Sequence, residues 1–214
     1  MDIDEARVRI AEIRRSGGKV SPDELDELWA ALPVVRPEEI LGSWRGGEFD
    51  SGHRFEGTLE KIGWHGKRFD SLTSVAPLVC RAGDGSLYVN SEMAGGGASL
   101  WMVEFRGEVT ATMVYDGKPV LDHFKRVDEE TLLGVMNGKG VRDSGRFYYF
   151  ILNRELSTHE VLTQVDLTRL ESTQDKSTQD KSTQHQSTPH QSTQHQSTQH
   201  QPTPHQSTRR DGAV

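Results

Sequence analysis

The sequence predicts a mainly β protein of the α+β class, in which an antiparallel up-and-down barrel follows a helical N-terminal segment. Short apolar segments recur at near-even spacing from residue 74 onward, and glycine, aspartate or asparagine residues separate them. Two amphipathic patterns precede these segments, and a polar repeat follows them. Short strands joined by hairpin turns are typical of closed barrels, whereas a polar repeat cannot build a core.

The N-terminal segment predicts two helices. Residues 4–15 place apolar side chains among charges at helical spacing, and two glycines end the pattern. The second helix begins at Ser21, which is followed by a proline at the first helical position. Pro37–Ile40 adds a short turn. The apolar residues of the second helix share one face, which predicts that it docks: Leu25, Leu28, Trp29 and Leu32.

The first strand is predicted at Leu41–Phe49, where three glycines surround a single tryptophan, Trp44. Glycine lets a neighbouring strand or turn approach the face of an indole ring. We therefore expect Trp44 inside the barrel, across its closed end, with Gly42 and Gly46 as structural residues. A strand with two bulge glycines and a core tryptophan is the alternative, and it too buries the indole.

Seven further segments bring the predicted number of strands to eight, which encloses space for side chains or one small ligand. An open sheet with helices on one face is the runner-up. The segments are Val75–Arg81, Leu87–Met93, Leu100–Phe105, Val109–Tyr115, Val120–Val127, Leu132–Met136 and Arg146–Arg154.

An insert separates the first two predicted strands. Apolar residues in Phe55–Trp64 are spaced four and three apart, which predicts a short helix at the barrel mouth. A surface excursion is the alternative. Lys67 and Arg68 follow it, and they face either an anionic headgroup or solvent.

Several separated blocks form a recognisable pattern: Gly42-Ser43-Trp44-Arg45-Gly46, Gly63–Phe69, Ala76–Val79, Asp122–Val127 and Gly134–Met136. Together they resemble the GXWXG family and the domain of unknown function 4334 that follows it, over about residues 22–156. The resemblance implies four parts: a helical segment at 1–41, a GXWXG domain at 42–98, the second domain at 99–157, and a linker and tail at 158–214.

The G-x-W element is shared with lipocalins, fatty-acid-binding proteins and haem-binding nitrobindins. The resemblance therefore implies a calycin-like barrel of eight to ten strands, without choosing its ligand and without bringing catalytic residues. Barrels of this kind commonly close by stacking a cation of the last strand on the tryptophan, which makes Arg154 the candidate partner of Trp44. Fatty-acid-binding proteins also carry a helical lid where the insert lies.

Composition excludes several classes of function. The net charge is −7 and the folded part lacks a basic bias, which argues against nucleic-acid binding. A single cysteine, Cys80, cannot form an intramolecular disulfide. The acidic N-terminus and the lack of a long apolar run predict a soluble, cytoplasmic chain with no transmembrane segment. Phosphate-loop, paired-histidine and nucleophile-elbow motifs are missing, so we expect no enzyme, no metal and no cofactor.

Charged residues of the predicted strand Val120–Val127 are the first candidates for a site. Alternation puts Asp122, Phe124 and Arg126 on one face and His123 on the other. If the first face points inward, its opposite charges must pair, bind water or hold a polar headgroup. The alternative is that this face lies in solvent.

The last predicted strand supplies the second candidates. Arg146, Tyr148 and Arg154 share one face. Arg146-Phe147-Tyr148 is similar to the Arg-x-Tyr pair with which fatty-acid-binding proteins hold a carboxylate, and a guanidinium and a phenol supply donors for an acid headgroup. A solvent-facing Arg146 is the alternative.

These features predict a lipocalin-like carrier or sensor of an amphipathic ligand, a fatty acid or a phospholipid. A haem-binding barrel, which needs an inward histidine, and an enzyme that uses a pair such as Asp122 and His123 remain alternatives. The predicted ligand-binding residues are Trp44, Arg45, Trp64, Lys67, Arg68, Asp122, Phe124, Arg126, Arg146 and Tyr148.

The C-terminal tail begins at Ser172 and repeats about every five residues. A polar tract of low complexity cannot offset its ordering entropy, so we expect it to be disordered. Its histidines recur every five residues, which does not place them on one helical face. Repeat expansion without function is therefore favoured over weak metal binding.

Overall fold

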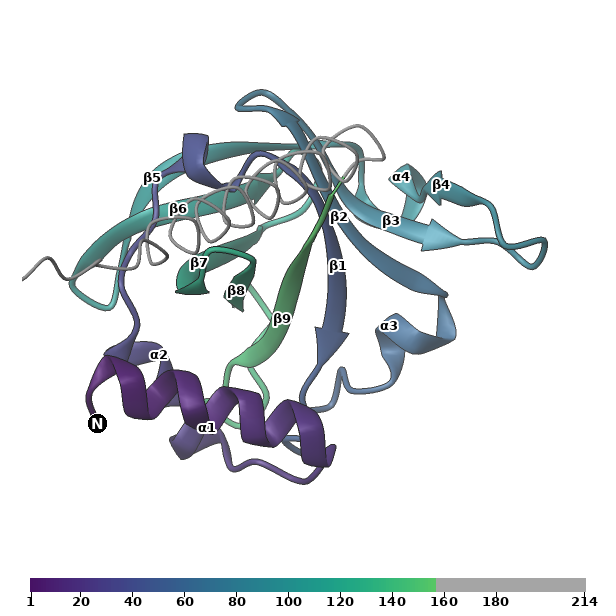
Figure 1. Ribbon diagram of the computed structural model, residues 1–214. Helices are drawn as coiled ribbons and strands as arrows, with labels where there is room; N and C mark the ends of the chain where they lie inside the picture. The colour runs from purple at the N-terminus through teal and green to yellow at the C-terminus, as the bar shows by residue number, and fades with distance from the viewer. Residues whose placement is uncertain (157–214) are drawn as a thin grey trace, which may run out of the picture. The chain divides into compact units, whose positions relative to one another are not determined.

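The computed structural model describes residues 1–156 (Figure 1). The predictions for the linker and the repeat tail, including their histidines, lie outside these residues. No helix of the described part is long and apolar enough to cross a membrane.

Both N-terminal helices form as the sequence predicts. Helix α1 spans Ile3–Ser16, and helix α2 spans Pro22–Ala31. The Ser21 hydroxyl caps α2 by accepting a hydrogen bond from the Glu24 backbone N–H at 3.1 Å, which satisfies one free donor of the first turn. A single 3₁₀ turn at Pro37–Ile40 leads into the first strand.

Nine antiparallel strands follow, and eight of them close into a barrel. The order is β1, β9, β8, β7, β6, β5, β3 and β2, and β2 pairs with β1 to complete the circle. The strands are β1 (Gly42–Glu48), β2 (Trp64–Ser71), β3 (Ser74–Arg81), β4 (Leu87–Val89), β5 (Ala98–Phe105), β6 (Glu108–Tyr115), β7 (Val120–Asp128), β8 (Thr131–Gly138) and β9 (Tyr148–Glu155).

The predicted number of barrel strands is right, but one of the predicted members is wrong. Residues Trp64–Ser71 form the second barrel strand, which the sequence pattern did not predict. Leu87–Met93 supplies only the short β4, which pairs with β3 outside the barrel, and then helix α4 at Ser91–Ala94. Figure 1 shows β4 and α4 projecting to one side. Charged residues interrupt the alternation of apolar and polar residues in β2, so its sequence does not look like a strand. The three residues of β4 are apolar and do look like one, but they are exposed.

Strand alternation divides the core in two. Side chains that point into the barrel form one apolar cluster, which contains Trp44, Phe69, Phe124 and Phe150. Side chains on the outer face of β8 and β9 form a second cluster with α1 and α2. In Figure 1 these helices lie together below β9. The helices therefore cover the outer face of the barrel. They do not contribute to its interior cluster, which the insert between β1 and β2 contacts instead.

The insert between β1 and β2 contains the predicted helix, although it is a single turn. Helix α3 spans Thr58–Lys61 and begins after Gly57, whose φ of 69° lies in the left-handed region. Its apolar neighbours Phe55, Leu59 and Ile62 pack against the interior cluster.

Candidate ligand site in the barrel

Trp44 lies across one end of the barrel, which we call the closed end, and it is 1% exposed. Its indole N–H donates to the Ile40 carbonyl at 2.8 Å. Arg154, its register partner on β9, places its guanidinium carbon 4.3 Å from the centroid of the ring. The same guanidinium donates to the carbonyls of Leu41 and Glu39. The predicted contact between Trp44 and Arg154 is therefore confirmed.

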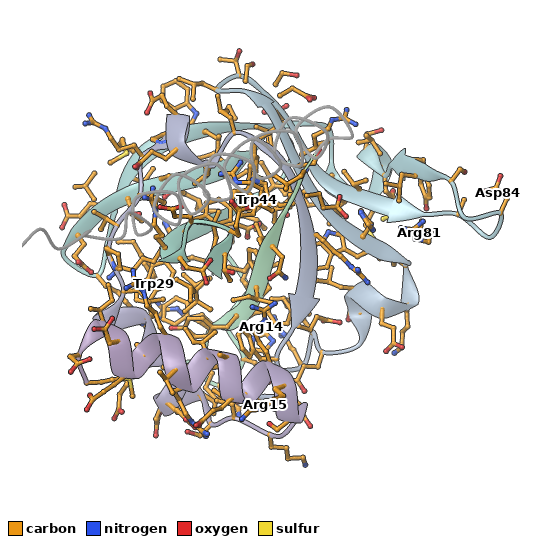
Figure 2. All side chains as sticks on the ribbon, in the orientation of Figure 1. Arg14, Arg15, Trp29, Trp44, Arg81 and Asp84 are labelled. Atoms are coloured by element: carbon orange, nitrogen blue, oxygen red, sulfur yellow. The ribbon has the colours of Figure 1, made fainter. Side chains whose placement is uncertain are left out.

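The second glycine of the motif makes room for another aromatic ring. A Cβ atom at Gly46 would lie 2.1 Å from the Trp64 ring, so only glycine fits there. Trp64 thus lies inside the barrel, edge-on to Phe150 at a centroid distance of 6.1 Å. Phe124 packs edge-on against Phe69 at 5.6 Å. We call Trp44, Trp64, Phe69, Phe124 and Phe150 the aromatic plug; Figure 2 shows Trp44 among the strands.

A layer of polar side chains lies in contact with the aromatic plug. The ammonium of Lys67 lies 2.8 Å from Asp122 Oδ2, and both side chains are almost fully buried. Tyr115 donates to the same carboxylate oxygen at 3.3 Å, and Lys67 also donates to the Pro77 carbonyl at 3.2 Å. Burial, reinforced by the charge of Asp122, raises the pKa of Tyr115 well above its usual value, so its phenol stays a donor.

Aromatic faces surround the Lys67 ammonium. It lies 5.0 Å from the centroid of Phe150 and 5.7 Å from those of Trp64 and Tyr115. Cation–π attraction and the ion pair together offset the cost of burying this charge. Asp122 therefore points into the barrel, which is one of the two alternatives predicted for this strand. Its ion-pair partner is Lys67 and not Arg126.

An apolar cavity of about 390 Å³ opens at the other end of the barrel. We call it the mouth cavity. The insert, the β6–β7 turn and the segment after β8 supply most of its wall, and Lys118 and Lys139 stand at its edge. Its lining is Phe55, Thr58, Leu59, Leu78, Met93, Tyr115, Lys118, Pro119, Val120, Met136, Lys139, Gly140, Val141 and Tyr148. The insert thus lies at the barrel mouth, as predicted.

Tyr148 connects this cavity to the first strand. It is 1% exposed, and its hydroxyl donates to the carboxylate of Glu48. Burial and this hydrogen bond raise the pKa of Tyr148 far above its usual value. Its hydroxyl is therefore occupied by Glu48, and not by Arg146 or a ligand carboxylate.

Of the ten predicted ligand-binding residues, Tyr148 alone lines the mouth cavity. Five belong to the aromatic plug and the polar layer: Trp44, Trp64, Lys67, Asp122 and Phe124. The remaining four are arginines that lie elsewhere. Arg45 is exposed on β1, and Arg68 pairs with Asp70 at 3.0 Å. Arg126 pairs with Glu39 at 2.7 Å near the closed end. Arg146 precedes β9 and pairs with Asp143 at 3.2 Å, so it does not share a strand face with Tyr148. All four guanidinium groups are at least partly exposed, which avoids the cost of burying an unpaired charge.

The described histidines do not fit the haem alternative, because none of them lines the mouth cavity. His53 Nδ1 accepts from the Phe55 N–H at 3.2 Å, and His65 lies between Arg81 and Glu155. His123 points out of the barrel and stacks on Phe105 at 4.0 Å. It therefore faces away from Asp122, so the pair that an enzyme alternative requires is not assembled.

Tyr115, Lys118 and Lys139 are site residues that the sequence did not predict. Tyr115 could have been found, because alternation puts it on the same face of β6 as Ala111 and Met113. The lysines belong to turns, where no periodicity indicates the direction of a side chain.

Two family models match this chain. The model described as GXWXG protein matches residues 27–85, which include β1 to β3, and the model described as Domain of unknown function (DUF4334) matches residues 96–154, which include most of β5 to β9. Each model thus contributes strands to the same barrel. This chain is similar to a protein from Thermomonospora curvata whose crystal structure is known. The two sequences are 40% identical, the match covers 71% of this chain and 99% of the other, and the structures superpose with a TM-score of 0.65. None of the curated proteins matches.

Proposed function

The chain belongs to the family of proteins in which a GXWXG domain precedes domain of unknown function 4334, and we propose that it binds an amphipathic ligand in the mouth cavity. The observation that carries the proposal is an apolar cavity of about 390 Å³ with two lysines at its edge. Small-molecule sites are commonly apolar clefts of about 300–1,000 Å³ that hold a few polar groups. An apolar chain in the cavity and an anionic head at its edge match this arrangement.

The volume of the mouth cavity lies near the lower end of the range that is usual for small-molecule sites. A single-chain acid, such as a fatty acid, therefore suits this cavity better than a two-chain phospholipid. Lys118 and Lys139 are exposed and form no ion pair within residues 1–156. Their ammonium groups are therefore available to a carboxylate. We further propose that the chain acts as a carrier or sensor in the cytoplasm. The single cysteine, Cys80, is a buried free thiol, which is compatible with a reducing compartment.

The test compares fatty acids with the corresponding fatty alcohols by isothermal titration calorimetry. Replacing both Lys118 and Lys139 with Met is expected to weaken binding of the acid about tenfold, because two partly exposed charge contacts are lost. Binding of the alcohol is expected to stay within about twofold, since the apolar wall remains. Lys19→Met is the matched control, because Lys19 is an exposed lysine in the loop between α1 and α2.

A chain that binds neither acids nor alcohols of any length would contradict the proposed function. Binding that Phe55→Ala leaves unchanged would contradict the placement of the ligand, because Phe55 contributes an aromatic wall of the mouth cavity.

A further inference from the structure

One oxygen of the buried carboxylate of Asp122 has no partner. Its Oδ2 atom accepts from Lys67 and Tyr115, whereas Oδ1 has no hydrogen-bond donor among residues 1–156. The residue is 0% exposed. Buried polar atoms are nearly always hydrogen-bonded, because an atom without a partner has given up its hydrogen bonds to water and gained none in return. This oxygen therefore calls for a donor that the described chain does not supply.

Asp122 lies directly behind the wall of the mouth cavity, although it is not itself one of the lining residues. Met136 is its register partner on β8, and Val120 precedes it by two residues on the same face of β7. Tyr115 donates a hydrogen bond to it. All three neighbours line the mouth cavity. A single layer of side chains thus separates the carboxylate from the cavity, and Oδ1 is reached from the cavity when these side chains shift.

The charge balance of the polar layer decides which donor fits. Lys67 neutralises Asp122, and its ammonium already reaches Pro77 and Asp122 and lies 3.5 Å from the Tyr115 hydroxyl. A ligand ammonium would add an unbalanced buried charge, which costs several kcal/mol. A hydroxyl donates one hydrogen bond and adds no charge.

We propose that the ligand carries a hydroxyl at its inner end, and that Asp122 Oδ1 accepts its hydrogen bond. This inference rests on the proposed function and narrows its ligand class to amphipathic acids whose apolar chain ends in a hydroxyl. The acid group lies at Lys118 and Lys139, and the terminal hydroxyl lies at the polar layer. The ligand would therefore be recognised at both ends, by charge outside and by a hydrogen bond inside.

The experiment titrates the full chain with unbranched acids from hexanoate to dodecanoate and with their ω-hydroxy counterparts. At the chain length that spans the cavity, the hydroxylated acid is expected to bind at least about tenfold more tightly, because a hydrogen bond to a charged group contributes about 1.5–3 kcal/mol. At shorter lengths the hydroxyl does not reach Asp122, so the plain acid binds at least as well.

A double variant, Lys67→Met with Asp122→Leu, replaces the buried ion pair with apolar groups and leaves no unpaired charge. It is expected to lose the preference for the hydroxyl while retaining plain acids. A preference that survives in this variant would overturn the inference. Circular dichroism shows whether the variant folds. If it does not fold, the titrations of the unmodified chain with the two series of acids still test the inference.

The outcomes separate the two proposals. Equal affinity for both series at every length would mean that a bound water satisfies Oδ1; it would overturn this inference and leave the proposed function standing. Binding of neither series would overturn both. Tighter binding of the hydroxylated acid at one chain length would support the inference.

Discussion

At the scale of single residues, the pair of Arg154 and Trp44 accounts for two features of the first strand, its tryptophan and its leading glycine. Gly42 has a φ of 116°, and a Cβ there would lie 3.2 Å from the Arg154 guanidinium. The glycine lets the cation lie across the indole and reach the Leu41 carbonyl. One small residue thus positions a contact that closes the barrel.

Arg154→Ala is expected to lower the free energy of unfolding by about 1–2 kcal/mol, since it removes a cation–π contact and two hydrogen bonds to carbonyls. Urea unfolding followed by tryptophan fluorescence measures the change. Arg45→Ala is the control, because Arg45 lies exposed on the same strand. An equal effect of both substitutions would show that the stacking contributes nothing.

A second prediction at this scale concerns His123, which is 1% exposed. Burial lowers the pKa of His123 from 6.5 to about 4. The unfolded chain therefore binds this proton at a higher pH than the folded protein does. Stability is complete above pH 6.5 and falls as the pH drops through this window, by up to about 3 kcal/mol near pH 4.

Replacing His123 with Gln is expected to flatten this part of the pH dependence, measured by urea unfolding between pH 7 and about pH 4. The pKa of His53 is also lowered, chiefly by burial, but its contribution is the same in both proteins. Parallel stability curves for the variant and the unmodified chain would contradict the assignment.

At the scale of elements, α1 and α2 stabilise the barrel from outside and take no part in the mouth cavity. Leu28 of α2 is fully buried in the outer cluster, and no residue of either helix lines the cavity. Leu28→Ala is expected to cost about 2–5 kcal/mol of stability, while the affinity for a fatty acid stays unchanged. Val8→Ala, at a position 60% exposed on α1, is the matched control. A loss of affinity at fixed folded fraction would show that the helices reach the site.

The elements also show how far the sequence determines the fold. Capping at Ser21, the glycine–tryptophan pattern and the hairpin turns were sufficient for the helices and seven barrel strands. Strand β2 was missed because Lys67 faces inward, where alternation demands an apolar residue. Its charge is tolerated only because Asp122 lies opposite, and such a tertiary contact leaves no local signal in either strand.

The same reason limits prediction of the site. Alternation correctly put Asp122 and Phe124 on one face of β7 and His123 on the other. Arg126 follows that alternation but lies near the closed end, where it reaches Glu39 in the 3₁₀ turn. Periodicity indicates the face of a residue but not its depth along the barrel axis.

At the scale of the described molecule, the barrel is filled at one end and hollow at the other. The aromatic plug fills the part next to the closed end, the ion pair of Lys67 and Asp122 lies against the plug, and the mouth cavity occupies the other end. A rigid plug fixes the polar layer, because densely packed rings allow little movement. Ligand selection and barrel stability therefore use different parts of one interior.

The last prediction concerns the whole chain. Residues 172–214 contain only Ala213 and Val214 as apolar members, so they cannot form a core of their own. We expect deletion of Ser172–Val214 to leave the melting temperature and the fatty-acid affinity unchanged, measured by differential scanning calorimetry and titration calorimetry. A shuffled tail of the same composition is the control for solubility. If the melting temperature falls by more than a few degrees on deletion but not on shuffling, the composition of the tail contributes to stability. If it falls in both variants, the native repeat contacts the barrel.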